Sequence, residues 1–162
     1  MNNDQFQSPS RGKLNLEELT RELTSYIGDA PKIQHRIIIG TDSEGNGRVE
    51  FVTAIVIHRV GHGGRYFWQK SYKNNITALR HKIYEETNLS LLWAQELLKK
   101  LRESRGEDYL GDDLEIHIDV GEGGATRDLI KEVVGMVKGN GFNAKTKPES
   151  FGASSVADKH VK

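Results

Sequence analysis

The hydrophobic residues near the start of the chain recur at the spacing of a helix. Asn15 followed by Glu18 has the form of a capping box, and Gly28 and Pro31 are stop signals. The apolar positions between these signals are Leu16, Leu19, Leu23 and Ile27. This pattern predicts an amphipathic helix ahead of the main fold. Residues 1–12 are polar, so we expect a flexible N-terminal tail there.

From residue 36 the pattern changes to short runs rich in β-branched residues. The three runs are RIIIGTDS at 36–43, VEFVTAIVIHRV at 49–60 and RYFWQKSY at 65–72, and Gly-rich turns separate them. Such runs, joined by short turns, predict three antiparallel strands that follow one another in a meander.

The second half of the chain alternates helix and strand patterns. Residues 77–102 contain no Gly or Pro, and one helical seam holds Leu79, Ile83, Ser90, Trp93, Leu97 and Leu101. LEIHIDV at 114–120 alternates like a strand, TRDLIKEVVGMVK at 126–138 reads as a helix, FNAKTK at 142–147 as a short strand and SSVADKHVK at 154–162 as a short helix. The order predicts an α/β fold with a five-stranded mixed sheet flanked by helices, in a single domain over residues 13–162.

Composition limits the chemistry. The 162 residues suit one domain, and they include neither a run of about 18 apolar residues nor the apolar centre of a secretory signal. We therefore expect a soluble, cytoplasmic protein with no membrane partner. The chain has no Cys, so a metal would need oxygen or imidazole ligands. Lys plus Arg equal Asp plus Glu at 23 each, so nucleic-acid binding would depend on local basic stretches.

Four acidic residues stand at distinctive places in this pattern. Asp42 ends the first strand, Asp119 ends the fourth, and Asp158 lies in the terminal segment. Glu86 falls on the apolar seam of the long helix, whereas Glu85 points about 100° away. A carboxylate on a buried seam must be neutral, paired or bound to a metal. Each Asp alone also fits a simpler reading, as a turn former at a strand end or a solvated charge.

The chain resembles the ribonuclease H-like superfamily in its element order and in several motifs. These motifs are GTDS at 40–43, IDVGEGGATRDLI at 118–130 and SSVADKHV at 154–161. GTDS, VTAIVIHRVG at 52–61, YEETNLSL at 84–91 and SSVADKHVK are similar more closely to the YkuK-like family, a bacterial group within that superfamily. This closer resemblance covers about residues 8–162.

The resemblance implies a set of site residues and an activity. The superfamily's catalytic acids fall on Asp42, Glu86, Asp119 and Asp158, which would be both catalytic residues and metal ligands. Hard carboxylate oxygens select Mg²⁺ or Mn²⁺, and two such ions can activate water and stabilise the leaving oxygen of a phosphodiester. We expect a metal-dependent nuclease acting on RNA, a hybrid or branched DNA. The alternative is a non-catalytic module that binds nucleic acid or a protein.

Other features leave alternatives open. His117 and His160 could assist the metal site or be structural, and GEGG at 121–124 could hold a phosphate or form a simple turn. The aromatic run at 66–68 could stack on bases or pack in the core. Because clustered carboxylates repel one another without an ion, at least one should have a raised pKa. The oligomeric state has no signature in the sequence.

Overall fold

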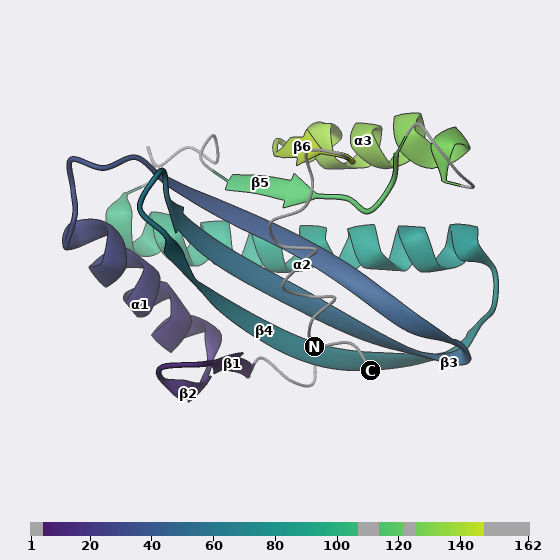
Figure 1. Cartoon of the computed structure of the whole chain (residues 1–162), viewed down its shortest axis with the longest axis horizontal. Coiled ribbons are helices and arrows are strands. Elements are labelled where there is room, and N and C mark those ends of the chain that lie inside the picture. Colours follow the sequence, from purple (N-terminus) through teal and green to yellow (C-terminus); the bar gives the residue numbers. More distant parts are fainter. Residues whose placement is uncertain (1–4, 107–113, 122–125, 148–162) are drawn as a thin grey trace.

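The computed structural model describes residues 5–106, 114–121 and 126–147 (Figure 1). The strands are β1 (Phe6–Ser8), β2 (Gly12–Leu14), β3 (His35–Arg59), β4 (Gly64–Ile76), β5 (Leu114–His117) and β6 (Asn143–Lys145). The helices are α1 (Leu16–Gly28), α2 (Leu79–Arg105), the 3-10 turn η2 (Arg127–Leu129) and α3 (Ile130–Gly139). The strands form one mixed sheet in the order β2-β1-β4-β3-β5-β6.

Strand β3 is long because it contains a hairpin. If its 25 residues were fully extended, they would span about 80 Å. The residues just outside its two ends are instead in contact, because the backbone N–H of Val60 donates to the carbonyl of Gln34 at 2.9 Å. Thr41 and Thr53 are likewise joined through their hydroxyls at 3.1 Å. The chain turns near Gly45, whose φ of 119° favours glycine. The two arms of β3 are the first and second strands of the predicted meander.

The strand directions agree with the predicted sheet, and the number of strands differs. β4 pairs antiparallel with β3, while β5 pairs parallel with β3 and β6 parallel with β5. Three antiparallel strands followed by parallel ones are therefore confirmed. With both arms of β3 counted, the sheet has seven strands among the described residues, so the prediction of five is wrong. The extra two are β1 and β2.

The predicted flexible tail over residues 1–12 is wrong for residues 5–12. β1 and β2 form an antiparallel hairpin, and Gln7 of β1 pairs with Trp68 of β4. Phe6 is fully buried, with its ring 5.0 Å from that of Trp93 in an edge-to-face contact. Residues 1–4 lie outside the described part of the chain. Since 148–162 also lie outside it, a single domain over 13–162 stays a prediction.

The described helices contribute to one hydrophobic core on one face of the sheet. Figure 1 shows α2 lying across the sheet, with α1 and α3 at its two sides. Ile37 and Ile39 point into this core, which also contains Leu23 of α1, Leu97 of α2 and Val137 of α3. The alternate residue on the same strand, Ile38, belongs to a smaller cluster with Val52 and Ala54, packed by Val56 and Trp68. The sheet thus presents a helix-covered face and a second, distinct face.

A local sequence signal explains where helix α1 begins. The capping box of α1 is confirmed, because the Glu18 N–H donates to Asn15 Oδ1 at 2.8 Å and the Asn15 N–H donates to Glu18 Oε1 at 2.9 Å. Helix α2 buries most of its predicted seam, although Leu79 at its first turn is exposed. Within the described residues, no helix is long and apolar enough to cross a membrane.

Candidate functional site

Helix α2 directs Glu86 toward the sheet. Its side chain lies on the buried face of the helix, between Ile83 and Ser90, and only 7% of the residue is exposed. The preceding residue, Glu85, points outward, where Lys73 binds its carboxylate and His81 Nε2 lies 3.7 Å from Oε1. The sequence distinction between these two adjacent carboxylates is therefore seen in the structure. Glu86 is the acidic side chain that α2 brings inside.

The environment of Glu86 disfavours its charged form. Burial raises the pKa of this carboxyl well above its usual value, and the negative charges of Asp42 and Asp119 raise it further. The hydroxyl of Ser43, which donates to Glu86 Oε2, opposes the shift, as does the charge of Lys82. The expectation of a carboxyl with a raised pKa is confirmed, with burial as a larger cause than repulsion.

Asp42 lies beside this group on the first arm of β3. It is half-buried, and one of its own oxygens, Oδ1, accepts the Ser43 backbone N–H at 2.9 Å. The preceding residue, Thr41, bonds Ser90 of α2 at 2.8 Å through the two hydroxyls. Ser90 stands about one helical turn after Glu86. The buried hydroxyl contacts therefore fix the strand that carries Asp42 against the helix that carries Glu86.

Asp119 meets a lysine from the neighbouring segment. The ammonium of Lys147 lies 2.8 Å from Asp119 Oδ1. That contact with Asp119 raises the pKa of Lys147, and the charges of Asp42 and Glu86 raise it further. The ammonium of Lys147 thus lies within electrostatic reach of all three carboxylates. The candidate site comprises Asp42, Glu86 and Asp119, with Lys147 at its open side.

The chemistry of the donors in this group suits a divalent metal ion. Carboxylate oxygens and the Ser43 hydroxyl are hard donors, which suits Mg²⁺ or Mn²⁺. Among residues 5–106, 114–121 and 126–147, however, no three acidic or His side chains form a ready metal-binding group. The cation found at Asp119 is the ammonium of Lys147. Asp158 and His160 lie outside the described residues, as do residues 122–124 of the GEGG turn.

His117 belongs to a polar chain beside the site. Its Nε2 lies 3.2 Å from Glu115 Oε1, and Glu115 Oε2 lies 3.1 Å from Arg36 Nε. Burial lowers the pKa of His117, with the Glu115 contact opposing the shift. His117 Nδ1 is buried and has no hydrogen-bond partner in the described part of the chain. This arrangement favours the structural reading of His117 over a role as a metal ligand.

One basic stretch of the sequence runs from Arg59 to Lys82, and several of its residues are engaged within the protein. Arg59 and Arg65 lie over the ring of Tyr26, at 3.7 and 4.9 Å from its centroid. Lys70 lies 3.4 Å from Glu50 and near the ring of Trp68.

In the aromatic run at 66–68, Phe67 is buried in the main core, Trp68 packs on the second face of the sheet, and Tyr66 is half-buried. Core packing thus accounts for Phe67.

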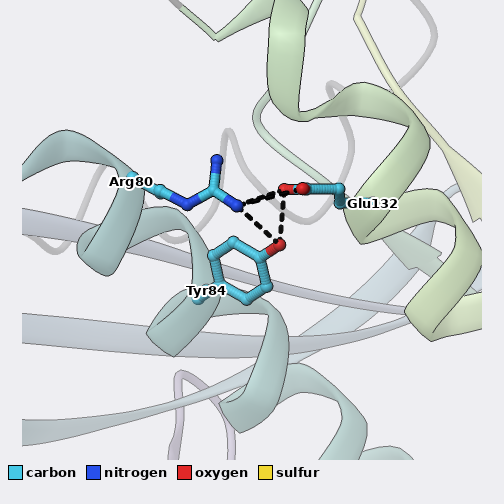
Figure 2. A network of polar contacts seen from close by, with 3 residues as sticks. All are labelled: Arg80, Tyr84 and Glu132. Carbon is cyan, nitrogen blue, oxygen red and sulfur yellow. Dashed lines mark hydrogen bonds and ion pairs between the residues drawn. The ribbon is translucent and has the colours of Figure 1, made fainter.

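A separate polar network joins α2 to α3 (Figure 2). Arg80 Nη2 donates to both carboxylate oxygens of Glu132, at 3.0 and 2.8 Å, and the hydroxyl of Tyr84 donates to Oε2. Arg80 and Tyr84 precede Glu86 on α2, and Glu132 lies on the helix that follows Asp119. The network therefore connects the two helices next to the candidate site.

Sequence reasoning did not assign Ser43 or Lys147 to the site. Ser43 follows Asp42 directly, and adjacent residues of a strand normally point to opposite faces. Lys147 could have been found from the parallel pairing of β5 with β6, since Lys145 lies opposite His117 and two further residues bring Lys147 beside Asp119. That register is a tertiary property, and Lys147 without it is one lysine in a basic stretch.

The sheet has antiparallel strands followed by parallel ones, and helices cover it. This is the architecture of an α/β protein of the ribonuclease H type. The chain belongs to the ribonuclease H-like family, whose model matches residues 18–162. It is similar to the uncharacterized protein YkuK of Bacillus subtilis (strain 168), with 28% identity over 169 aligned positions that cover 97% of this chain and 96% of the relative. No solved structure matches the chain. The family membership supports a nuclease-like or nucleic-acid-binding module.

Proposed function

We propose that this protein is a divalent-metal-dependent nuclease that hydrolyses phosphodiester bonds of RNA, a hybrid or branched DNA. Asp42, Glu86 and Asp119 would bind Mg²⁺ or Mn²⁺, and Asp158 would complete the ligand set. The observation that carries the proposal is the buried Glu86, whose carboxyl lies within electrostatic reach of Asp42 and Asp119. A carboxyl that is buried beside two like charges destabilises the fold unless a cation offsets it, and such groups cluster at functional sites.

The chain's own residues would prepare the site for this chemistry. Bound ions would activate a water molecule and neutralise charge on the phosphate. The Ser43 hydroxyl holds Glu86 through Oε2, so one oxygen of that carboxylate is oriented in advance. The Thr41–Ser90 contact holds β3 against α2 and thereby keeps Asp42 near Glu86. Substrate phosphates would be gripped mainly by Lys and Arg side chains.

The direct test is a cleavage assay with four labelled substrates. Purified protein is incubated with single-stranded, duplex, hybrid and junction substrates, in Mn²⁺ or in EDTA. We expect cleavage of at least one substrate in Mn²⁺ and none in EDTA. Asp119→Asn should reduce the rate by at least about a hundredfold, because it removes a charged ligand from the ion that stabilises the transition state.

Glu85→Gln is the matched control for this assay. Glu85 neighbours Glu86 on α2 but binds Lys73 and lies near His81 outside the site. Its variant should cleave at the wild-type rate and bind substrate normally, while Asp119→Asn should keep its nucleic-acid affinity. Equal cleavage by wild type and Asp119→Asn would show that the activity lies elsewhere or comes from a contaminant.

A non-catalytic nucleic-acid-binding module is the second candidate. The observation in its favour is the ammonium of Lys147 at Asp119, together with the lack of a ready three-ligand group among residues 5–106, 114–121 and 126–147. On this reading the carboxylates and the lysine form a fixed polar cluster. Binding of the labelled substrates that is unchanged between Mn²⁺ and EDTA, without cleavage, would favour it.

A further inference from the structure

The site has three carboxylates and one ammonium among its described residues. Lys147 Nζ contacts Asp119 Oδ1 at 2.8 Å, which is the distance of a strong charge-assisted hydrogen bond. Charge from Asp42 and Glu86 reaches the same ammonium. Lys147 therefore neutralises part of a negative cluster that would otherwise repel itself.

The backbone around Lys147 is held by the sheet. The Lys147 N–H donates to the carbonyl of Val120 at 2.8 Å, and the Ile118 N–H donates to the carbonyl of Lys145 at 2.9 Å. These two bonds continue the parallel pairing of β5 with β6 past Asp119. Gly121 leaves room for the lysine stem, since a Cβ at Gly121 would lie 3.0 Å from Lys147 Cβ. These backbone hydrogen bonds thus position the Lys147 side chain beside the carboxylates.

The end of the Lys147 side chain is free to move away. Its side chain is 60% exposed, whereas that of Asp119 is 31% exposed. Solvent screens a pair with this exposure, and a lysine has a flexible four-carbon stem. The backbone is anchored while the ammonium can leave Asp119 for water at small cost.

We propose that Lys147 is the built-in counter-ion of this site, and that a divalent cation binds Asp119 by displacing the Lys147 ammonium. The inference rests on the proposed metal site. Mg²⁺ requires its ligand oxygens at about 2.0–2.1 Å, so an oxygen that accepts a hydrogen bond from an ammonium is partly occupied. The ammonium and the ion also repel each other across a few ångströms. Lys147 accordingly stabilises the metal-free arrangement of the carboxylates and lowers the affinity of the site for metal.

The test compares Mn²⁺ binding in variants that differ at Lys147. The loss of the free Mn²⁺ signal in electron paramagnetic resonance gives the Kd for wild type, Lys147→Met, Lys147→Arg and Lys138→Met at low salt. Lys138 is an exposed lysine in the last turn of α3, so its variant controls for loss of one positive charge. We expect Lys147→Met to bind Mn²⁺ about tenfold more tightly, from the loss of one nearby charge. Lys147→Arg and Lys138→Met should stay near the wild-type Kd.

Thermal unfolding in EDTA gives the second readout. Lys147→Met should melt at a lower temperature than Lys138→Met, because its carboxylates lack their counter-ion, and added Mn²⁺ should remove that difference. If Lys147→Met does not fold in EDTA, Lys147→Gln, which has a shorter polar stem, is measured in the same way.

The outcomes separate this inference from the proposed function. Equal Kd values for Lys147→Met and Lys138→Met would overturn the counter-ion role and leave the metal site standing. No Mn²⁺ binding by any variant, even with the ammonium removed, would overturn the metal site and this inference together. Binding by Lys147→Met alone would support the displacement of Lys147 most strongly.

Discussion

Two charged groups lie along the same helix, and their environments are opposite. The outer group, Arg80, Tyr84 and Glu132, pairs one carboxylate with one guanidinium, and the Arg80 and Glu132 side chains are 60% and 44% exposed. The inner group sets Asp42, Glu86 and Asp119 against Lys147, with Glu86 almost completely buried. The outer group is balanced in charge, and the inner group has more negative than positive charge.

The pKa shifts of the two carboxyls run in opposite directions. Hydrogen bonds from Tyr84 and then Arg80 lower the pKa of Glu132, so its partners favour the charged form. Burial and neighbouring acids raise the pKa of Glu86, so its surroundings disfavour the charged form. A charge-paired carboxyl such as that of Glu132 is sufficient to join two helices. The arrangement around Glu86 costs folding free energy, and carboxyls with such raised pKa values cluster at functional sites.

The largest expected difference between the two groups is their response to Mn²⁺. Mn²⁺ should raise the melting temperature of the wild type by an amount equivalent to about 2.7 kcal/mol at a hundredfold excess over Kd. Asp42→Asn should lose most of this shift and be at least as stable as wild type in EDTA, because it removes one repelling charge. Glu132→Gln should keep the full shift. Differential scanning calorimetry with and without Mn²⁺ measures all three proteins.

An opposite pattern would break the comparison. If Mn²⁺ gives no shift in the wild type and Asp42→Asn is strongly destabilised in EDTA, then Asp42 is a structural turn residue. The non-catalytic reading would then account better for the inner group.

A smaller effect is expected from pH. Below the ordinary Glu pKa of 4.5, Glu86 is protonated in the folded and the unfolded protein and contributes no pH dependence. Above it the unfolded chain releases the proton while the folded protein retains it, so stability falls as pH rises toward the raised folded pKa. Glu86→Gln removes this fall, and its Oε1 can still accept the Ser43 hydroxyl. In EDTA we expect the variant to gain on the order of 1 kcal/mol over wild type at pH 8 and little at pH 4.

Urea unfolding at the two pH values measures this gain, with Glu85→Gln as the control. Glu85 pairs with Lys73, so its variant should show no gain at pH 8. A Glu86→Gln variant that loses equal stability at both pH values would show that the carboxyl makes a structural contact which the amide cannot replace.

The smallest effect is expected in the outer group. Glu132→Gln removes the charge that Arg80 and Tyr84 bind at the surface, and water screens such pairs. We expect a slight loss of stability at low salt that disappears at 1 M salt, where the Debye length is about 3 Å. Urea midpoints at the two salt concentrations measure it. A loss independent of salt would show that the network acts through packing of α3.

The local sequence pattern was sufficient to predict that Glu86 faces inward, and it was insufficient to predict the contact between Lys147 and Asp119. The spacing of Ile83, Trp93 and Leu97 defines the buried face of α2, and Glu86 falls on that face by helical geometry alone. The contact between Lys147 and Asp119 depends on the register of two parallel strands whose residues lie far apart in the chain. No periodicity within either strand specifies that register.

The N-terminal hairpin shows the same limit in the fold. Its strands have three residues each, too few for a period to be read, and its polar composition is that of a tail. It is ordered by contacts made at a distance, with Gln7 paired to Trp68 and Phe6 packed on Trp93. Tertiary contacts override composition in such short segments. Long patterned segments such as α2 were predictable because each turn repeats the same signal.

That hairpin also covers part of the edge of the sheet. The outermost described strands, β2 and β6, have three residues each, whereas β4 has 13. A long unpaired strand offers a row of N–H and C=O groups to other chains, and short edge strands offer few. Removal of the β1–β2 hairpin would uncover the β4 edge at Trp68, where Gln7 pairs with it. The N-terminal hairpin thus leaves less of the long β4 strand open to pairing with other chains.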